Sequence, residues 1–147
     1  MYFEDLRTGM TKDIPPVTIE KSKMMAFARD YDPIPLHLDE DYARESRFGA
    51  LIAPGVMTFM SVWAKYLEAD FAGREVIAGK STQIEWIKPV YAGDTLTARA
   101  ELTRCVQRNA KNGLIEITIE AYNQHGDLVL TNVTEAVVKC RAAEASR

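Results

Sequence analysis

The stretch "GVMTFMSVWAKYLEADF", residues 55–71, carries apolar side chains around most of the circumference of a helix. Its apolar positions are Val56, Met57, Phe59, Met60, Val62, Trp63, Ala64 and Leu67. A helix that is apolar on nearly every side is usually buried, so the stretch predicts one long, buried helix. Pro54 and Gly55 stand at its start, where a proline loses no hydrogen bond and a glycine lets another molecule approach the backbone closely.

From residue 79 onward the apolar period changes to two. "TLTARAEL" (95–102) and "LIEITIEAY" (114–122) alternate apolar and polar residues, and "LVLTNVTEAVV" (128–138) forms the last apolar run. The turn-forming stretches "YAGD", "NAKNG" and "NQHGD" precede these runs, which predicts half-buried strands in a long antiparallel meander. One buried helix followed by about four strands, with no second long helix, predicts an α+β fold in which a curved antiparallel sheet wraps around the helix.

Length and composition favour one globular domain spanning residues 1–147. The chain is 47 % apolar and 27 % charged, with both kinds of residue in short runs along the sequence, as in ordinary globular proteins. A net charge of −3 without a dense Lys/Arg cluster speaks against a nucleic-acid partner. The first twenty residues contain acids and a Pro-Pro pair, unlike a signal peptide or a membrane segment, so we expect a cytoplasmic protein without a membrane partner.

Two cysteines, Cys105 and Cys140, stand apart from each other and from any set of metal-binding residues. Neither a CxxC pair nor a ligand spacing typical of zinc is present. We therefore expect both thiols to be reduced and structural.

The stretch "DYDPIPLHLDEDYARESRFGALIAPG", residues 30–55, contains one of the two histidines. A short helix over residues 21–29 is expected to lead into it. Because Pro33 and Pro35 lack amide protons and restrict the residues before them, residues 32–36 are predicted to be extended and His37 to lie on an ordered loop.

Asp32 and His37 are five residues apart with two prolines limiting the conformations between them. A carboxylate and an imidazole held together can orient a water molecule, remove one of its protons and return a proton elsewhere, which suits hydration, dehydration or hydrolysis. The amide of Gly55 is expected at a helix N-terminus, where free donors favour a developing oxyanion. Asp39 is better placed to cap a brief helix from residue 40, and His125 is expected to be exposed in a turn.

Three motifs resemble one family. "DPIPLHLD" (32–39), "FGALIAPG" (48–55) and "WIKPVYAGDTL" (86–96) are similar to the MaoC-like dehydratases, the hotdog-fold group that includes the (R)-specific enoyl-CoA hydratases. The resemblance implies a hotdog fold, with a long central helix wrapped by the sheet. It also implies that Asp32 and His37 activate water and that Gly55 binds the thioester oxygen.

The chemistry that this resemblance implies is reversible hydration of trans-2-enoyl-CoA to (R)-3-hydroxyacyl-CoA. It requires no metal or redox cofactor, and the CoA thioester is the substrate. A homodimer or a dimer of dimers is implied as well, with the acyl-CoA tunnel near the subunit interface, and an open sheet edge makes such pairing reasonable. Four basic residues could contact CoA phosphates or simply be solvated: Arg47, Lys88, Arg104 and Arg108.

Two positions depart from the family pattern. Ile34 stands where well-known hydratases carry Asn, and Pro54 stands where some relatives have His. Two alternatives stay open beside the hydratase, the second of them because of Ile34. One is an acyl-CoA thioesterase that directs the activated water at the carbonyl carbon, and the other is a non-catalytic subunit that only binds an acyl thioester.

Overall fold

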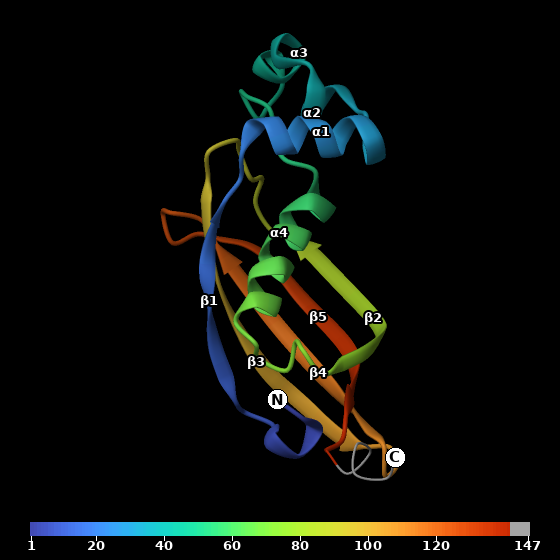
Figure 1. Ribbon diagram of the computed structural model, residues 1–147. Coiled ribbons are helices and arrows are strands. Elements are labelled where there is room, and N and C mark those ends of the chain that lie inside the picture. The colour runs from blue at the N-terminus through green and yellow to red at the C-terminus, as the bar shows by residue number, and fades with distance from the viewer. Residues whose placement is uncertain (142–147) are drawn as a thin grey trace.

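The computed structural model describes residues 1–141. One central helix, α4, lies against a five-stranded sheet, and three shorter helices gather at one end of the molecule (Figure 1). The elements in chain order are η1 (Phe3–Asp5), β1 (Thr11–Thr18), α1 (Lys21–Tyr31), α2 (Pro35–Leu38), α3 (Glu40–Glu45), α4 (Gly55–Glu68), β2 (Val76–Trp86), β3 (Thr95–Gln107), β4 (Asn112–Tyr122) and β5 (Leu128–Lys139).

The strand order in the sheet is β1-β3-β4-β5-β2, and every neighbouring pair is antiparallel. The predicted meander is therefore right for β3, β4 and β5 but wrong for β2, which pairs with β5 at the far edge. The link between β2 and β3 is no tight hairpin, because it passes the segment before α4, where the amide of Ala53 donates to the carbonyl of Val90 at 2.7 Å. A backbone bridge between Ile52 and Tyr91 fixes the same crossing.

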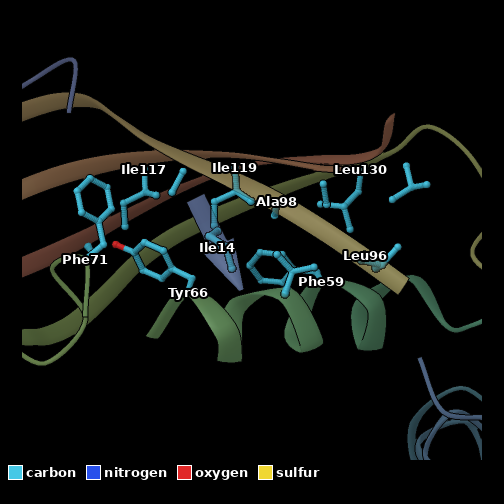
Figure 2. Close-up of a cluster of buried hydrophobic side chains, with 14 of the residues drawn as sticks. Ile14, Phe59, Tyr66, Phe71, Leu96, Ala98, Ile117, Ile119 and Leu130 are labelled. Atoms are coloured by element: carbon cyan, nitrogen blue, oxygen red, sulfur yellow. The ribbon is translucent and has the colours of Figure 1, made fainter. Parts of the chain in front are cut away.

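The hydrophobic core lies between α4 and the concave face of the sheet. Phe59 and Tyr66 point from α4 toward Ile117 and Ile119 of β4 (Figure 2). The inward positions of β3 and β4 are the ones that the alternation predicts, and they are Leu96, Ala98, Ala100, Leu102, Ile115, Ile117, Ile119 and Ala121. Burying each large aliphatic side chain contributes about 1.5–3 kcal/mol, so this layer is the main source of stability.

The predicted long helix forms, but the expectation that it is buried holds for only one of its faces. One face of the helix packs on the sheet, but Val56 and Met60 are each 48 % exposed and Leu67 is 39 % exposed. The physical reason is that the sheet covers only one side of the helix, while α1, α2 and α3 lie beyond its N-terminal end (Figure 1). Beside this apolar stripe, β2 is exposed over most of its length.

In residues 1–141, no helix is both long and apolar enough to span a bilayer.

Candidate active site

The segment between α1 and α3 positions the predicted carboxylate and imidazole. Asp32 is the C-cap residue that follows α1, and its amide donates to the carbonyl of Ala28 at 2.9 Å. The prediction of an extended chain as far as residue 36, with His37 on a loop, is wrong, because α2 begins at Pro35 and contains His37. A proline at the first helical position loses no hydrogen bond, and it restricts the residue before it. Ile34 is accordingly extended (φ −95°, ψ 152°), and α2 begins at the next residue.

Asp32 and His37 form a pair. His37 Nε2 lies 3.2 Å from Asp32 Oδ2, and the side chains are 6 % and 42 % exposed, respectively. On the other side of the ring, His37 Nδ1 lies 2.7 Å from the carbonyl oxygen of Ile52. Since a carbonyl only accepts hydrogen bonds, Nδ1 carries a proton in either charge state of the ring. Proton exchange with a substrate or a water is therefore confined to Nε2, the atom that faces the carboxylate.

The two residues Ile52 and Ala53, just before α4, are hydrogen-bonded to α2 and to the link between β2 and β3. The amide of Ile52 donates to the carbonyl of Leu36 at 3.2 Å, and the carbonyl of Ile52 accepts from His37. The next residue, Ala53, donates to Val90 in the link between β2 and β3. These bonds fix the start of α4 relative to the imidazole, so the two predicted parts of the site are held as one unit.

Gly55 is the first residue of α4, and Pro54 caps the helix without a side-chain hydrogen bond. Among residues 1–141 no group accepts a hydrogen bond from the amide of Gly55. The structure shows a further reason for this glycine, because a Cβ at residue 55 would lie 2.4 Å from Trp86 Cε2 of the same chain. The free amide at the N-terminus of a 14-residue helix can stabilise a negatively charged oxygen.

The three predicted site residues line one cavity of about 430 Å³. Asp32, His37 and Gly55 share its walls with Arg47 and Lys88. The two other basic residues considered from the sequence, Arg104 and Arg108, are not among the lining residues, which also include Phe48, Ile52, Ala53, Val56, Thr58, Trp86, Ile87, Pro89 and Val90. The arrangement can therefore hold a small polar group between a proton-exchanging pair and an oxyanion donor.

Trp86 was not singled out by the sequence analysis, although it stands in the motif "WIKPVYAGDTL". The available signal was an aromatic residue at the end of a strand, two positions before Lys88 in the same motif. That signal gives no position for the ring, which depends on the pairing of β2 with β5, where Trp86 lies opposite Leu130. The crossover of β2 to the far edge of the sheet is the step that the alternation pattern did not predict.

The remaining predicted residues lie outside this cavity. Asp39 caps α3, as predicted, by accepting from the amide of Tyr42 at 3.0 Å. His125 is exposed in the turn between β4 and β5, also as predicted. Cys105 and Cys140 are free, and burial raises the pKa of both thiols, so they stay protonated at neutral pH. Within the described range, no three His, Cys, Asp or Glu side chains cluster in a way that could hold a metal ion.

The sequence matches the family model of the MaoC-like domain over residues 5–124. An uncharacterised protein of Bacillus subtilis, YdeM, is 27 % identical over 95 % of this chain and 99 % of its own length. The (R)-specific enoyl-CoA hydratase of Rhodospirillum rubrum is 31 % identical over 71 % of this chain and 72 % of that protein. The crystal structure of the MaoC-like dehydratase from Rhodospirillum rubrum superposes with a TM-score of 0.88 at 28 % identity, covering 96 % of this chain and 98 % of that one. The predicted α+β hotdog fold is thereby confirmed.

Proposed function

Since this chain belongs to the MaoC-like domain family, whose relatives include hydratases and dehydratases, we propose that it catalyses the reversible addition of water to a trans-2-enoyl thioester. The product is the (R)-3-hydroxyacyl thioester. The observation that carries the proposal is the 3.2 Å pair of Asp32 and His37 in the same cavity as the free amide of Gly55.

In the hydration direction a water molecule binds in the cavity beside the Asp32–His37 pair, within hydrogen-bond reach of both side chains. Its oxygen forms a bond to the β-carbon of the substrate while the pair takes up one of its protons. The electrons of the carbon–carbon double bond move toward the thioester, so that negative charge collects on the carbonyl oxygen. The α-carbon then takes a proton from the same pair, which returns Asp32 and His37 to their starting state.

The amide of Gly55 is the proposed donor to that oxygen. It lies at the N-terminus of α4, where the unpaired amides and the helix dipole favour negative charge. Removing one comparable donor in other enzymes lowers the rate by about 10²–10³-fold, so one amide can account for several kcal/mol of barrier reduction.

CoA is the proposed carrier of the acyl group. Arg47 lines the cavity, and its guanidinium lies 4.8 Å from the centre of the Phe48 ring. Among residues 1–141 no carboxylate lies within salt-bridge distance of it. Lys88, also in the cavity wall, forms a 3.5 Å ion pair with Asp127. An anionic carrier is compatible with this positively charged rim.

A homodimer is the proposed assembly. The exposed apolar stripe of α4 (Val56, Met60 and Leu67) lies beside the open edge strand β2, and two copies could cover both features together. An edge strand as long as the 11-residue β2 is usually covered in stable proteins, because its free backbone groups otherwise pair with other chains. Sedimentation of the purified protein at micromolar concentration is expected to give twice the mass of one chain, and a monomer would refute the homodimer.

The test of the reaction follows the loss of enoyl-thioester absorbance when the protein is added to crotonyl-CoA and to a longer trans-2-enoyl-CoA. Asp32→Asn and His37→Gln are each expected to lower kcat by at least about 10³-fold, because each removes a member of the pair. The matched controls are Asp30→Asn, an exposed aspartate two residues away, and His125→Gln, the other histidine. Both controls are expected to keep kcat within about twofold.

The same samples test the alternatives. Release of free thiol from a saturated acyl-CoA would instead identify a thioesterase. Binding of acyl-CoA without turnover of either kind would identify a non-catalytic binding protein. In that case Asp32→Ala would leave the binding intact.

A further inference from the structure

Trp86 is the last residue of β2, and its ring lies against the first residue of α4. The position that a Cβ would take on Gly55 is 2.4 Å from Cε2, 2.5 Å from Nε1 and 2.8 Å from Cζ2 of the indole. These are neighbouring atoms on the N–H side of the ring. In Figure 1 the arrow of β2 points toward the N-terminal part of α4, in agreement with this contact. The indole nitrogen therefore lies beside the amide that we propose as the oxyanion donor.

The backbone at Trp86 is fixed by the sheet, whereas the side chain is open to the cavity. Trp86 pairs with Leu130 of β5, and the next residue, Ile87, donates its amide to the carbonyl of Val129 at 2.8 Å. The residue is 53 % exposed and lines the same cavity as His37. A side chain on a backbone that is already fixed can present a polar group to a ligand with little further loss of conformational entropy.

The indole N–H has no acceptor within the described part of the chain. Indole nitrogen is a donor only, and in proteins it usually finds an acceptor once it is removed from water. A ligand that fills the cavity would remove water from this donor, and so the ligand has to supply the acceptor. The acceptor nearest to the neighbouring amide in the proposed reaction is the thioester oxygen.

We propose that the indole N–H of Trp86 is a second donor to the thioester oxygen, beside the amide of Gly55. This inference rests on the proposed function. Two donors from different elements, one from the start of α4 and one from the end of β2, define the position of the oxygen better than one donor can. Both strengthen their hydrogen bonds as the carbonyl oxygen gains charge, which is the condition for lowering the barrier rather than only binding substrate.

The alternative is that the ring only fills space over Gly55, which explains the glycine without any contact between the indole nitrogen and a ligand. Trp86→Phe separates the two roles, because it keeps an aromatic ring and removes the N–H. A tryptophan analogue with sulfur in place of the indole N–H, introduced at residue 86, is a closer isostere. Trp63→Phe is the matched control, since Trp63 stacks on Tyr66 at 4.7 Å and is not among the residues that line the cavity.

With crotonyl-CoA, Trp86→Phe and the sulfur isostere are expected to lower kcat by at least about tenfold and to change KM by less than about threefold. Trp63→Phe is expected to keep kcat within about twofold. Circular dichroism and thermal unfolding verify that each variant is folded. Turnover by the folded Trp86→Phe variant within about twofold of an active native protein would overturn the proposal.

A second measurement does not depend on turnover. The infrared carbonyl stretch of bound butyryl-CoA, labelled with ¹³C at the carbonyl, reports hydrogen bonds to the thioester oxygen in a complex that cannot be hydrated. We expect the band to lie at a lower wavenumber in the native protein than in Trp86→Phe, and to be unchanged by Trp63→Phe. If the native protein binds acyl-CoA but hydrates no enoyl thioester, the proposed function fails while this band still decides the role of Trp86. An identical band in native protein and Trp86→Phe would overturn the inference.

Discussion

The strands β3, β4 and β5 and the segment from residue 30 to residue 55 are held in place by different interactions. In the strands, alternate side chains are buried under α4, and this apolar layer supplies most of the stability (Figure 2). The segment adds only Ala43, Leu51 and Ala53 to the core. It is otherwise held by two prolines, one helix cap and a few hydrogen bonds, among them the two made by the backbone of Ile52. The difference teaches that stability and proposed chemistry reside in separate parts of one small fold, so variants should affect one and spare the other.

The largest effect on stability is expected from the sheet. Ile117 is fully buried in the layer under α4, and Ile117→Ala is predicted to lower the free energy of unfolding by about 2–5 kcal/mol, because it removes buried apolar surface and leaves a cavity. Chemical denaturation monitored by circular dichroism measures this change. The fraction that remains folded should keep the KM and kcat of the native protein within about twofold.

Val133→Ala is the control for this prediction, since Val133 belongs to β5 but is 37 % exposed. Its expected cost is below about 1 kcal/mol, because little apolar area is lost from the core. A large loss of activity in folded Ile117→Ala would contradict the proposal that the sheet supplies stability without affecting the site.

The second prediction concerns the point where the two regions meet. Gly55→Ala keeps the backbone amide but places a Cβ 2.4 Å from the ring of Trp86, so either the ring or the helix must move. We predict a loss of about 1–3 kcal/mol in unfolding free energy from this overpacking, together with a fall in kcat of at least about tenfold. Denaturation and the absorbance assay measure the two effects on the same samples.

A double-mutant cycle identifies the cause of the Gly55→Ala effect. In a Trp86→Ala background no ring obstructs the new methyl group, and the stability cost of Gly55→Ala should fall to a few tenths of a kcal/mol. An undiminished cost in that background would mean that the glycine is needed for the backbone of the helix start rather than for the ring.

The sheet and α4 could be predicted from the sequence because both depend on local periodicity. Leu96, Ala98, Ala100 and Leu102 alternate with polar residues, and the structure buries these four on one face. The position of β2 could not be predicted in this way, because strand order depends on contacts between residues far apart in the chain. The exposure of Met60 on α4 could not be predicted either, because a helical pattern does not indicate how much of the helix one sheet covers.

The Asp32–His37 pair could be predicted because the two residues are close in the sequence and prolines restrict the chain between them. The helical placement of His37 does not follow from the prolines, because a proline disfavours the interior of a helix but is well suited to its first position, where Pro35 stands. Trp86 was missed for a different reason. Its contact with Gly55 joins positions 31 residues apart through a crossover that no local pattern encodes.

The third prediction concerns binding at the rim of the cavity. Arg47→Gln is predicted to raise KM for crotonyl-CoA by about three- to tenfold at low salt, because it removes a cation that could contact the carrier. The KM for crotonyl-pantetheine, which lacks the phosphates, should change by less than twofold. Arg44→Gln is the matched control, since Arg44 pairs with Asp41 on α3 and is not among the lining residues. An equal increase in KM for both thioesters would mean that Arg47 contacts the acyl or pantetheine part instead.

The smallest change in stability is expected from a substitution at Asp5, far from the cavity. Arg141 binds the carboxylate of Asp5 at 2.7 and 2.8 Å. The Arg141 guanidinium, aided by the amide of Tyr2, holds the pKa of Asp5 below its usual range. Because the folded state binds this proton less readily than the unfolded state, the pair stabilises the fold above the unfolded pKa of Asp5 and loses its effect as the pH falls through the folded pKa.

Asp5→Asn should therefore lower Tm slightly at pH 7 and leave Tm unchanged at a pH below the folded pKa of Asp5. Calorimetry at a series of pH values between these two conditions measures the difference. Asp13→Asn, an exposed aspartate on β1, is the control and should show no such trend. A Tm difference that grows on acidification would have the wrong sign for a lowered pKa. The activity of Asp5→Asn should match that of the native protein throughout, because this ion pair is not part of the cavity wall.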